Sequence, residues 1–486
     1  MSQATTTDLY EASMALSYLR EGMTEDATFS LFVRDLPPGR GFLVSAGLEP
    51  VLDFLTDFRV TANDARDFAA ALGRPAHEVE PLVGLCFEGE VRAVPEGRVV
   101  LPGEPLLEVT APLPQAQLVE TWLLSQVSHQ TTVAAKAARC VLAAAGHPVV
   151  DFSLRRAHGP GAGMQAARVG AMVGFAGTSN VAAALRWNTP ASGTMAHSYI
   201  EAFGDEEAAF MAFARSRAGP ITLLVDTYDT VEGVVTAARV LNALERGPGS
   251  AIRLDSGDLA ELAHRSRTVL DQAGLPDVGI IASGGLDEYR IDDLVRSGAP
   301  IDVYAVGTKV GTSSDAPYLD SAYKLVEYDG RPVMKLSAAK VTAPGRKQVL
   351  RAAGMDDVIA LAEDDVPEGR EPLLRTVMSA GRRTHARDTL ATAHERFVGD
   401  LAALPQQACR IRDPEAPAPV VSDRLSALAS DVRQRLEKGV EQRRSGGARS
   451  QHSDLPGARR TAEHPKLAHN GQTEGATRPP ENRHRR

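Results

Sequence analysis

The sequence predicts an α/β protein whose central part is a series of βα units, arranged as a barrel or as an open parallel sheet. Four short apolar runs each end in a polar, acidic or glycine-containing turn and are followed by a helical pattern. The turns begin at residues 226, 255, 283 and 307, so they lie 29, 28 and 24 residues apart. A parallel strand and its crossover helix need about this length. The polar turns should therefore lie together at the carboxyl ends of the strands, where site residues of such folds gather.

The segment before these units has a mixed pattern and predicts a smaller α+β domain over residues 1–115. Residues 8–22 and 48–58 carry apolar side chains at helical spacing, and the apolar run 42–44 between them predicts a strand. Short β-like runs at 99–101 and 106–109 are separated by turns rich in proline and glycine. A long helical pattern then ends at a Gly-His-Pro sequence. It predicts a connecting helical segment over residues 116–148.

Three segments complete the predicted organisation of the chain. We expect a barrel-like domain over residues 149–340 and a C-terminal α+β region over 341–440 that packs back on the N-terminal domain. Residues 443–486 hold 10 basic and 4 acidic residues, no aromatic residue and many small polar ones. Such a segment cannot bury enough surface to offset the entropy of ordering. We therefore predict a disordered basic tail over residues 441–486, most simply a solvated one.

Composition excludes several classes of protein. The 53 basic and 62 acidic residues give a net charge of −9, which argues against broad attraction to nucleic acid or to a membrane surface. The three cysteines are far apart, so neither a disulfide framework nor a structural zinc site is indicated. The N-terminus lacks a secretory pattern, and no stretch has the roughly 20 apolar residues of a membrane span. We expect a cytoplasmic protein.

Two of the turns have the chemistry of phosphate binding. Their backbone N–H groups, hydroxyl groups and lysine suit phosphate oxygens, and they comprise Ser283, Gly284 and Gly285 in one turn and Gly307, Thr308 and Lys309 in the other. Either motif alone is more simply a tight turn. Two of them at one edge of a sheet favour a phosphate site. Asp255 and Asp258 in a neighbouring turn suit ribose hydroxyls or water-bound Mg²⁺, or else cap a helix.

A second group of polar residues lies upstream. Arg155 and Arg156 are adjacent on an otherwise acidic chain, and a guanidinium offers forked donors to phosphate. Solvated surface arginines are the simpler interpretation of this pair alone. Glycine-containing polar runs follow at 177–180 and 193–198.

Six motifs together resemble one known family. They are, in chain order, residues 7–10, 152–156, 177–180, 193–198 (Gly-Thr-Met-Ala-His-Ser), 253–258 (Arg-Leu-Asp-Ser-Gly-Asp) and 306–308. Their content and order resemble nicotinate phosphoribosyltransferase. The likeness runs from about residue 7 to about residue 351, includes residues 340–348, and fades after about residue 400.

The resemblance implies a fold and a reaction. The fold is a type II phosphoribosyltransferase-like irregular parallel β/α barrel with a smaller N-terminal α+β domain, so residues 149–340 would be the catalytic domain. Enzymes of this family join nicotinate to 5-phosphoribosyl 1-pyrophosphate and release pyrophosphate, which is the first step of NAD salvage from nicotinate. They couple this step to ATP hydrolysis through a phosphohistidine. The resemblance also implies Mg²⁺, ATP as co-substrate, no organic prosthetic group, and a homodimer with shared active sites.

The resemblance also implies roles for individual residues. His197 would be the phosphohistidine, and Asp255 would lie by the ribose and be a candidate ligand of Mg²⁺ bound through phosphates. Five residues would form the nicotinate site: Tyr10, Phe152, Ser179, Thr194 and Arg253, with Tyr10 reaching it from the partner subunit. Six would bind phosphoribosyl pyrophosphate: Arg155, Ser283, Gly284, Gly285, Gly307 and Thr308.

Ser179 bears on the choice of substrate. The similar family that uses the amide carries an acid at the matching place, and a carboxylate there would repel nicotinate. Two other classes remain as alternatives: a related phosphoribosyltransferase or barrel-type phosphate enzyme, and a non-catalytic binding protein on the same fold. The serine argues against the amide-using variant, and intact His197, Arg253 and Asp255 argue against a non-catalytic protein.

Overall fold

The computed structural model describes residues 3–336 and 342–447. The chain divides into two units, residues 1–434 and 435–486. The second unit is described only where it contains the end of helix α16 (Asp423–Gly447). This helix includes the start of the segment expected to be disordered, which is therefore helical as far as residue 447. The rest of the predicted tail lies outside the described residues.

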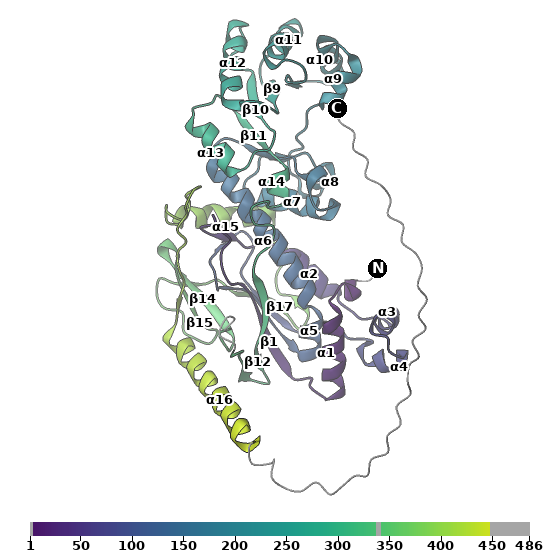
Figure 1. Ribbon diagram of the computed structural model, residues 1–486, viewed down its shortest axis with the longest axis vertical. Helices are drawn as coiled ribbons and strands as arrows, with labels where there is room; N and C mark the ends of the chain where they lie inside the picture. Colours follow the sequence, from purple (N-terminus) through teal and green to yellow (C-terminus); the bar gives the residue numbers. More distant parts are fainter. Residues whose placement is uncertain (1–2, 337–341, 448–486) are drawn as a thin grey trace, which may run out of the picture. The chain divides into compact units, whose positions relative to one another are not determined.

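A six-stranded parallel sheet forms the centre of the predicted barrel-like domain (Figure 1). Its strands are β6 (Val149–Asp151), β7 (Gly177–Thr178), β8 (Thr222–Leu224), β9 (Ala251–Leu254), β10 (Gly279–Ala282) and β11 (Val303–Val306). The spatial order is β7-β6-β11-β10-β9-β8, which is the circular order of a barrel with the ladder open between β7 and β8. The predicted βα units and their parallel pairing are confirmed.

Helices follow the strands of this sheet as the sequence pattern predicts. They are α7 (Pro160–Met172), α8 (Val181–Trp187), α9 (His197–Phe203), α10 (Glu206–Arg215), α11 (Thr230–Ala243), α12 (Leu259–Gln272), α13 (Glu288–Arg296) and α14 (Thr308–Gly311). Asp229, Asp258 and Asp287 accept backbone N–H bonds at the starts of α11, α12 and α13. Asp258 is thus a helix cap, the simpler of the two interpretations that its sequence allowed.

The predicted connecting helix is two helices, α5 (Leu113–Leu118) and α6 (Glu120–Ala143). Helix α6 contacts α7 and α13 beside the parallel sheet, and α2 (Leu48–Asp57) and β2 (Leu43–Val44) in the N-terminal region (Figure 1). Its Ala134 and Ala138 are buried in the core of the parallel sheet, whereas Leu123 and Val127 are buried in the N-terminal core. One helix therefore contributes to both hydrophobic cores.

The N-terminal region is built on a seven-stranded sheet with the order β13-β12-β1-β5-β3-β17-β18. These strands are β1 (Asp26–Val33), β3 (Glu90–Ala93), β5 (Pro105–Pro112), β12 (Ser321–Tyr328), β13 (Arg331–Pro332), β17 (Arg375–Ser379) and β18 (Arg382–Arg383). Strand β4 (Val99–Val100) pairs with β2, and the remaining helices here are α1 (Leu9–Arg20), α3 (Ala62–Leu72) and α4 (Ala76–Val79). Strands β12 and β13 precede the expected boundary at residue 340 but pair in this sheet.

The C-terminal region adds a four-stranded sheet, helix α15 and the first part of α16 to this unit. The elements are β14 (Lys347–Ala352), β15 (Asp356–Leu361), β16 (Glu371–Pro372), β19 (Val420–Val421) and α15 (Leu390–Ala403). Asp400 of α15 accepts from Arg98 Nε and from Val99 N, each at 2.8 Å, and from Arg351 Nη1 at 3.0 Å. These bonds tie the C-terminal region to the N-terminal one.

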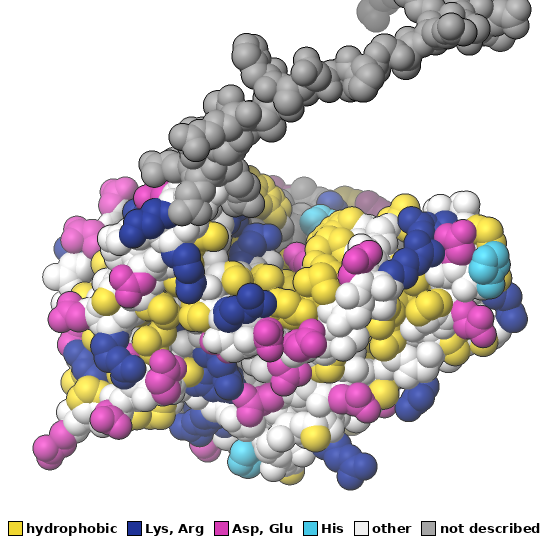
Figure 2. Space-filling view, turned by 90° about the horizontal axis from the view of Figure 1, so that it is seen from below, with side chains coloured by type: hydrophobic (Ala, Val, Ile, Leu, Met, Phe, Trp, Pro, Cys, Tyr) yellow, Lys and Arg dark blue, Asp and Glu magenta, His cyan; other side chains and the backbone are white. Residues whose placement is uncertain are grey.

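The described helices include none with the length and apolar character needed to cross a membrane. On the face shown in Figure 2, acidic and basic side chains are interspersed among hydrophobic and uncharged ones. The described residues of this face therefore form no continuous basic surface.

Candidate active site

The candidate site lies beside the opening of the parallel sheet between β7 and β8. The chain after α8 runs beside β7, where Thr178 N donates to Pro190 O at 3.0 Å and Ser192 N donates to Thr178 O at 2.9 Å. This pairing brings the next residues, Thr194 to His197, to the carboxyl ends of the strands. The run 193–198 thus lies close to the turns after β8 and β9, where His197 approaches Thr227 and Asp255.

A cavity of about 400 Å³ lies at this edge of the sheet. Its lining comprises Phe152, Leu154, Arg155, Ser179, Gly193, Thr194, Met195, Ala196, His197, Arg253 and Asp255. Seven of the residues predicted to form the site are among them. The volume is within the range of small-molecule pockets.

Arg253 is the buried cation of this cavity. It is the third residue of β9 and only 8% exposed, and its Nη1 donates to Thr194 Oγ1 at 2.5 Å. Its Nη2 lies 3.6 Å from Asp255 Oδ1. Its Nε is buried and has no hydrogen-bond partner among the described residues. Burial lowers the pKa of this guanidinium from its usual value, although Asp255 opposes the shift. A buried arginine with an unused donor suits an anionic ligand.

His197 is the first residue of α9, across the cavity from β9. Its Nδ1 lies 3.1 Å from Thr227 Oγ1, and its Nε2 lies 3.9 Å from Asp255 Oδ2. The hydroxyl therefore engages one ring nitrogen and leaves Nε2 available toward Asp255. Thr227, in the turn after β8, is a site residue that the sequence did not single out.

The turns after β9 and β10 are joined by side-chain and backbone contacts. Ser283 Oγ donates to Asp255 Oδ1 at 2.5 Å. Gly284 has a φ of +88°, and a Cβ added there would lie 1.7 Å from the Asp255 carbonyl oxygen. Only glycine fits so close an approach in this conformation. Asp226 Oδ2 accepts from Asp255 N at 3.0 Å and from Ser256 Oγ at 2.6 Å, which fixes the same turn from β8.

The turn after β11 lies beside the turn after β6. Phe152 N donates to Val306 O at 2.7 Å, and a Cβ added to Gly307 would lie 3.0 Å from Phe152 O. Thr308 then begins α14, where Lys309 Nζ pairs with Asp287 at 2.7 Å. This pair links the two predicted phosphate turns, because Asp287 follows Gly285 closely in the chain.

Phe152, Arg155 and Ser179 are held by the ends of β6 and β7. Asp151 is buried, accepts from Ser153 N at 2.9 Å and from Thr178 Oγ1 at 2.6 Å, and its carbonyl accepts from Ser179 N at 2.8 Å. Both strand ends are therefore fixed around one carboxylate.

Tyr10 does not line this cavity. It lies on α1 and is 47% exposed, and burial, followed by the charges of Glu120 and Glu11, raises the pKa of its hydroxyl. The structure thus places one predicted nicotinate-site residue apart from the other four in the same chain.

Sequence comparison identifies the family. The chain matches the nicotinate phosphoribosyltransferase N-terminal domain over residues 5–128 and the nicotinate phosphoribosyltransferase family over residues 148–343. A nicotinate phosphoribosyltransferase of Mycobacterium tuberculosis is 46% identical over 428 residues, which cover 86% of this chain and 91% of that protein. The chain belongs to the nicotinate phosphoribosyltransferase family.

More distant relatives agree with this assignment. The human nicotinate phosphoribosyltransferase is 32% identical over 517 residues, covering 88% of this chain and 96% of that protein. The crystal structure of human nicotinic acid phosphoribosyltransferase has a TM-score of 0.77 at 30% identity and covers 88% of this chain and 99% of that one. A nicotinate-nucleotide pyrophosphorylase from Pyrococcus furiosus has a TM-score of 0.69 at 26% identity, covering 82% and 95%. The activity of the family is a glycosyl transfer to nicotinate in NAD biosynthesis, and the site is discussed below in these terms.

Proposed function

We propose that this enzyme couples nicotinate phosphoribosyl transfer to ATP hydrolysis through His197. In the glycosyl step the pyridine nitrogen of nicotinate bonds to C1 of the ribose as the bond from C1 to pyrophosphate breaks. The products are nicotinate mononucleotide and pyrophosphate. The ribose carries oxocarbenium-like charge in the transition state, so alignment and electrostatics are the protein's main contribution.

The nicotinate carboxylate is assigned to Arg253, assisted by Thr194. The observation that carries this assignment is the buried guanidinium whose Nε has no hydrogen-bond partner among the described residues. A carboxylate at this place would both satisfy that donor and neutralise a buried charge. Phe152 and Ser179 line the same cavity and are assigned to the pyridine ring. An uncharged Ser179 is compatible with an anionic substrate.

The phosphoribosyl pyrophosphate is assigned to the neighbouring strand ends. The 5-phosphate would lie at the N–H groups of Gly284, Gly285, Gly307 and Thr308 with the Ser283 hydroxyl nearby, and Arg155 would face phosphoryl oxygens. Asp255 is assigned to the ribose. The close contact of Gly284 with the Asp255 backbone makes one rigid unit of the two turns.

Mg²⁺ is proposed to arrive bound to the phosphates. Among residues 3–336 and 342–447, no group of three or more His, Cys, Asp or Glu side chains is placed to hold a metal ion. The donor set nevertheless fits an ion carried by phosphates, since Asp226 Oδ1 is buried without a hydrogen-bond partner in the described chain. Asp255 would be the candidate ligand beside it. The ion would neutralise charge on the departing pyrophosphate.

In the coupled reaction His197 Nε2 attacks the γ-phosphorus of ATP. A nitrogen–phosphorus bond forms, the bond from the γ-phosphorus to the bridging oxygen breaks, and ADP leaves; water later hydrolyses the phosphohistidine. Support comes from Thr227, which engages Nδ1 and leaves Nε2 free to act as a nucleophile. A histidine near neutral pH is suited to this role.

We further propose a cytoplasmic homodimer in which Tyr10 of one subunit completes the site of the other. The support is its position outside the cavity that its own chain forms.

The test is mass analysis of the products formed from nicotinate, phosphoribosyl pyrophosphate and Mg-ATP. The proposal predicts nicotinate mononucleotide, pyrophosphate, ADP and phosphate, with the ADP yield falling when nicotinate is withheld. In His197→Ala, nicotinate-linked ADP formation should disappear while slow ATP-independent synthesis survives. ADP formation that the variant retains at the wild-type rate would contradict the coupling.

A further inference from the structure

A second, larger cavity lies outside the proposed active site. It has a volume of about 660 Å³ and is bounded by α7, the end of α8 and the start of α15. Phe175, Trp187 and Pro190 give it an apolar and aromatic wall, Arg186 contributes a guanidinium, and His394 contributes an imidazole ring. This size is in the range that holds a nucleotide-sized ligand.

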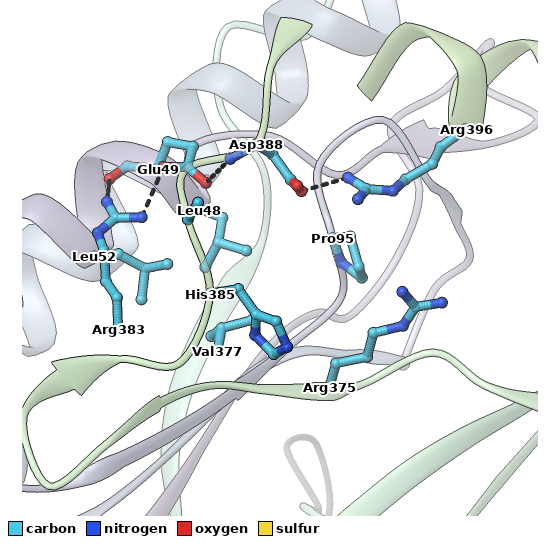
Figure 3. Close-up of a pocket in the computed structure, with 11 residues that line it drawn as sticks. Leu48, Glu49, Leu52, Pro95, Arg375, Val377, Arg383, His385, Asp388 and Arg396 are labelled. Atoms are coloured by element: carbon cyan, nitrogen blue, oxygen red, sulfur yellow. Dashed lines mark hydrogen bonds and ion pairs between the residues drawn. The ribbon is translucent and has the colours of Figure 1, made fainter. Parts of the chain in front are cut away.

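The acidic residues of this cavity are already neutralised. Glu49 accepts from Arg383 Nη1 at 2.8 Å, and Asp388 accepts from Arg396 Nη1 at 2.5 Å. Figure 3 shows both contacts in the smaller pocket that shares these two carboxylates with the larger one. Neither acid is therefore left to repel an anion.

Arg186 also lines this cavity, and its guanidinium has no acidic partner in the described part of the chain. Its guanidinium lies 5.6 Å from the centre of the Trp187 ring, and it makes no hydrogen bond or ion pair within the described residues. His394 Nδ1 lies 3.0 Å from the carbonyl oxygen of Met172, so that nitrogen carries a proton and Nε2 remains for a ligand. A free guanidinium beside an indole ring suits a ligand with an aromatic ring and a phosphate.

This cavity and the active-site cavity share one segment of chain. Trp187 and Pro190 line the first, and residues 193–197 line the second. Between them, the segment is bonded to Thr178 through Pro190 O and Ser192 N. Thr194, two residues past Ser192, accepts from Arg253 Nη1 at 2.5 Å and donates to Met195 O of the same segment at 3.2 Å. A ligand against Trp187 and Pro190 would therefore act on the segment that positions Thr194.

We propose that this second cavity binds a nucleotide, with the base against Trp187 and the phosphate at Arg186, and that its occupancy changes the affinity for nicotinate through residues 187–197. The coupling rests on the proposed assignment of Arg253 and Thr194 to nicotinate; binding in the cavity does not.

Tryptophan fluorescence tests the binding directly. The chain has two tryptophans, and Trp122 stacks on Phe54 in the N-terminal region, so Trp122→Phe leaves Trp187 as the reporter. In this background, adenosine monophosphate should quench the emission saturably, and inorganic phosphate should bind at least about tenfold more weakly because it lacks a ring. Arg186→Gln should weaken the nucleotide by about tenfold or more, whereas Arg155→Gln, in the other cavity, should not. Absence of saturable quenching, or a loss in Arg155→Gln equal to that in Arg186→Gln, would overturn the site.

The coupling is tested by nicotinate titration with and without adenosine monophosphate. The expected shift in nicotinate Kd is about fivefold or more, which Arg186→Gln should abolish. An unchanged Kd at saturating nucleotide would contradict the effector role. The proposed nicotinate site fails separately, if Arg253→Ala leaves nicotinate binding unchanged in the absence of nucleotide.

Discussion

Replacing Arg253 by alanine should separate nicotinate from nicotinamide. The wild-type guanidinium is 8% exposed, donates to Thr194 and keeps a buried Nε without a partner in the described chain. Loss of a buried charge-assisted pair costs about 2 to 5 kcal/mol, or roughly 30-fold to several-thousand-fold in affinity. Nicotinate should lose this amount. Nicotinamide has no carboxylate and should lose much less.

The assay is direct binding of the two ligands to wild type and variant by calorimetry. Arg253→Lys is the matched control, because it keeps the charge and removes the forked donor. It should weaken nicotinate by less than the alanine variant does. Adding Ser179→Asp to Arg253→Ala should move preference further toward the amide, with poor overall activity. Equal losses of nicotinate and nicotinamide in Arg253→Ala would show that this arginine is not the carboxylate partner.

Three further predictions concern the dimer, a turn and pH. Inactive Tyr10→Ala and inactive His197→Ala chains, once co-assembled, should regain part of the activity; verified mixed dimers that stay inactive would count against a shared site. Gly284→Ala should raise the KM for phosphoribosyl pyrophosphate at least about tenfold, because the added Cβ would lie 1.7 Å from the backbone of Asp255. Gly285→Ala, whose Cβ would meet nothing within 4 Å, should lose only about 1 kcal/mol of stability to its positive φ. An equal rise in KM in the two variants would refute the contact. Burial raises the pKa of Glu11 to about 7 from 4.5, so its contribution to stability is full below about pH 4.5 and is lost as pH rises through about 7. Thermal unfolding of the wild type should show this loss of stability, about 1 to 3 kcal/mol, and Glu11→Gln should not show it. The same dependence of unfolding free energy on pH in both proteins would contradict the prediction.

The sequence predicted the parallel sheet well because its signal is local. Strands β8 to β11 are short apolar runs with a turn directly after each, and the turn spacing alone indicates βα units. Strand β7 consists of Gly177 and Thr178 and was not predicted as a strand. The N-terminal sheet was harder to predict. Strand β1 lies at its centre between β5 and β12. Its residues alternate between polar and apolar from Asp26 to Leu31, but Thr28 and Ser30 are buried as well, so the alternation does not reveal the central position of the strand.

Contacts between distant residues could not be read from local patterns. Strand β12 pairs with β1 although nearly three hundred residues separate Val33 from Ser321. Thr227 meets His197 across the opening between β7 and β8, and nothing in the spacing of these residues predicts that contact. The motifs supplied the strand-end residues, whereas the partners that orient them required the fold.

The end of α16 shows why composition misplaced the start of the tail. Its polar residues and the low content of large apolar side chains predict poor burial. They are also compatible with a helix, which needs only good helix-forming residues such as Glu, Gln and Arg. The boundary set at residue 441 was therefore too early.

Phosphorylation of His197 is the most direct test of the proposed mechanism. Wild-type enzyme incubated with γ-³²P-labelled Mg-ATP should take up acid-labile label, and peptide mass spectrometry should locate it on the peptide containing His197. Nicotinate and phosphoribosyl pyrophosphate should discharge the label at a rate compatible with turnover, and Thr227→Val should reduce labelling without removing the site. No acid-labile label in active wild-type enzyme, or undiminished labelling of His197→Ala, would contradict coupling through this histidine.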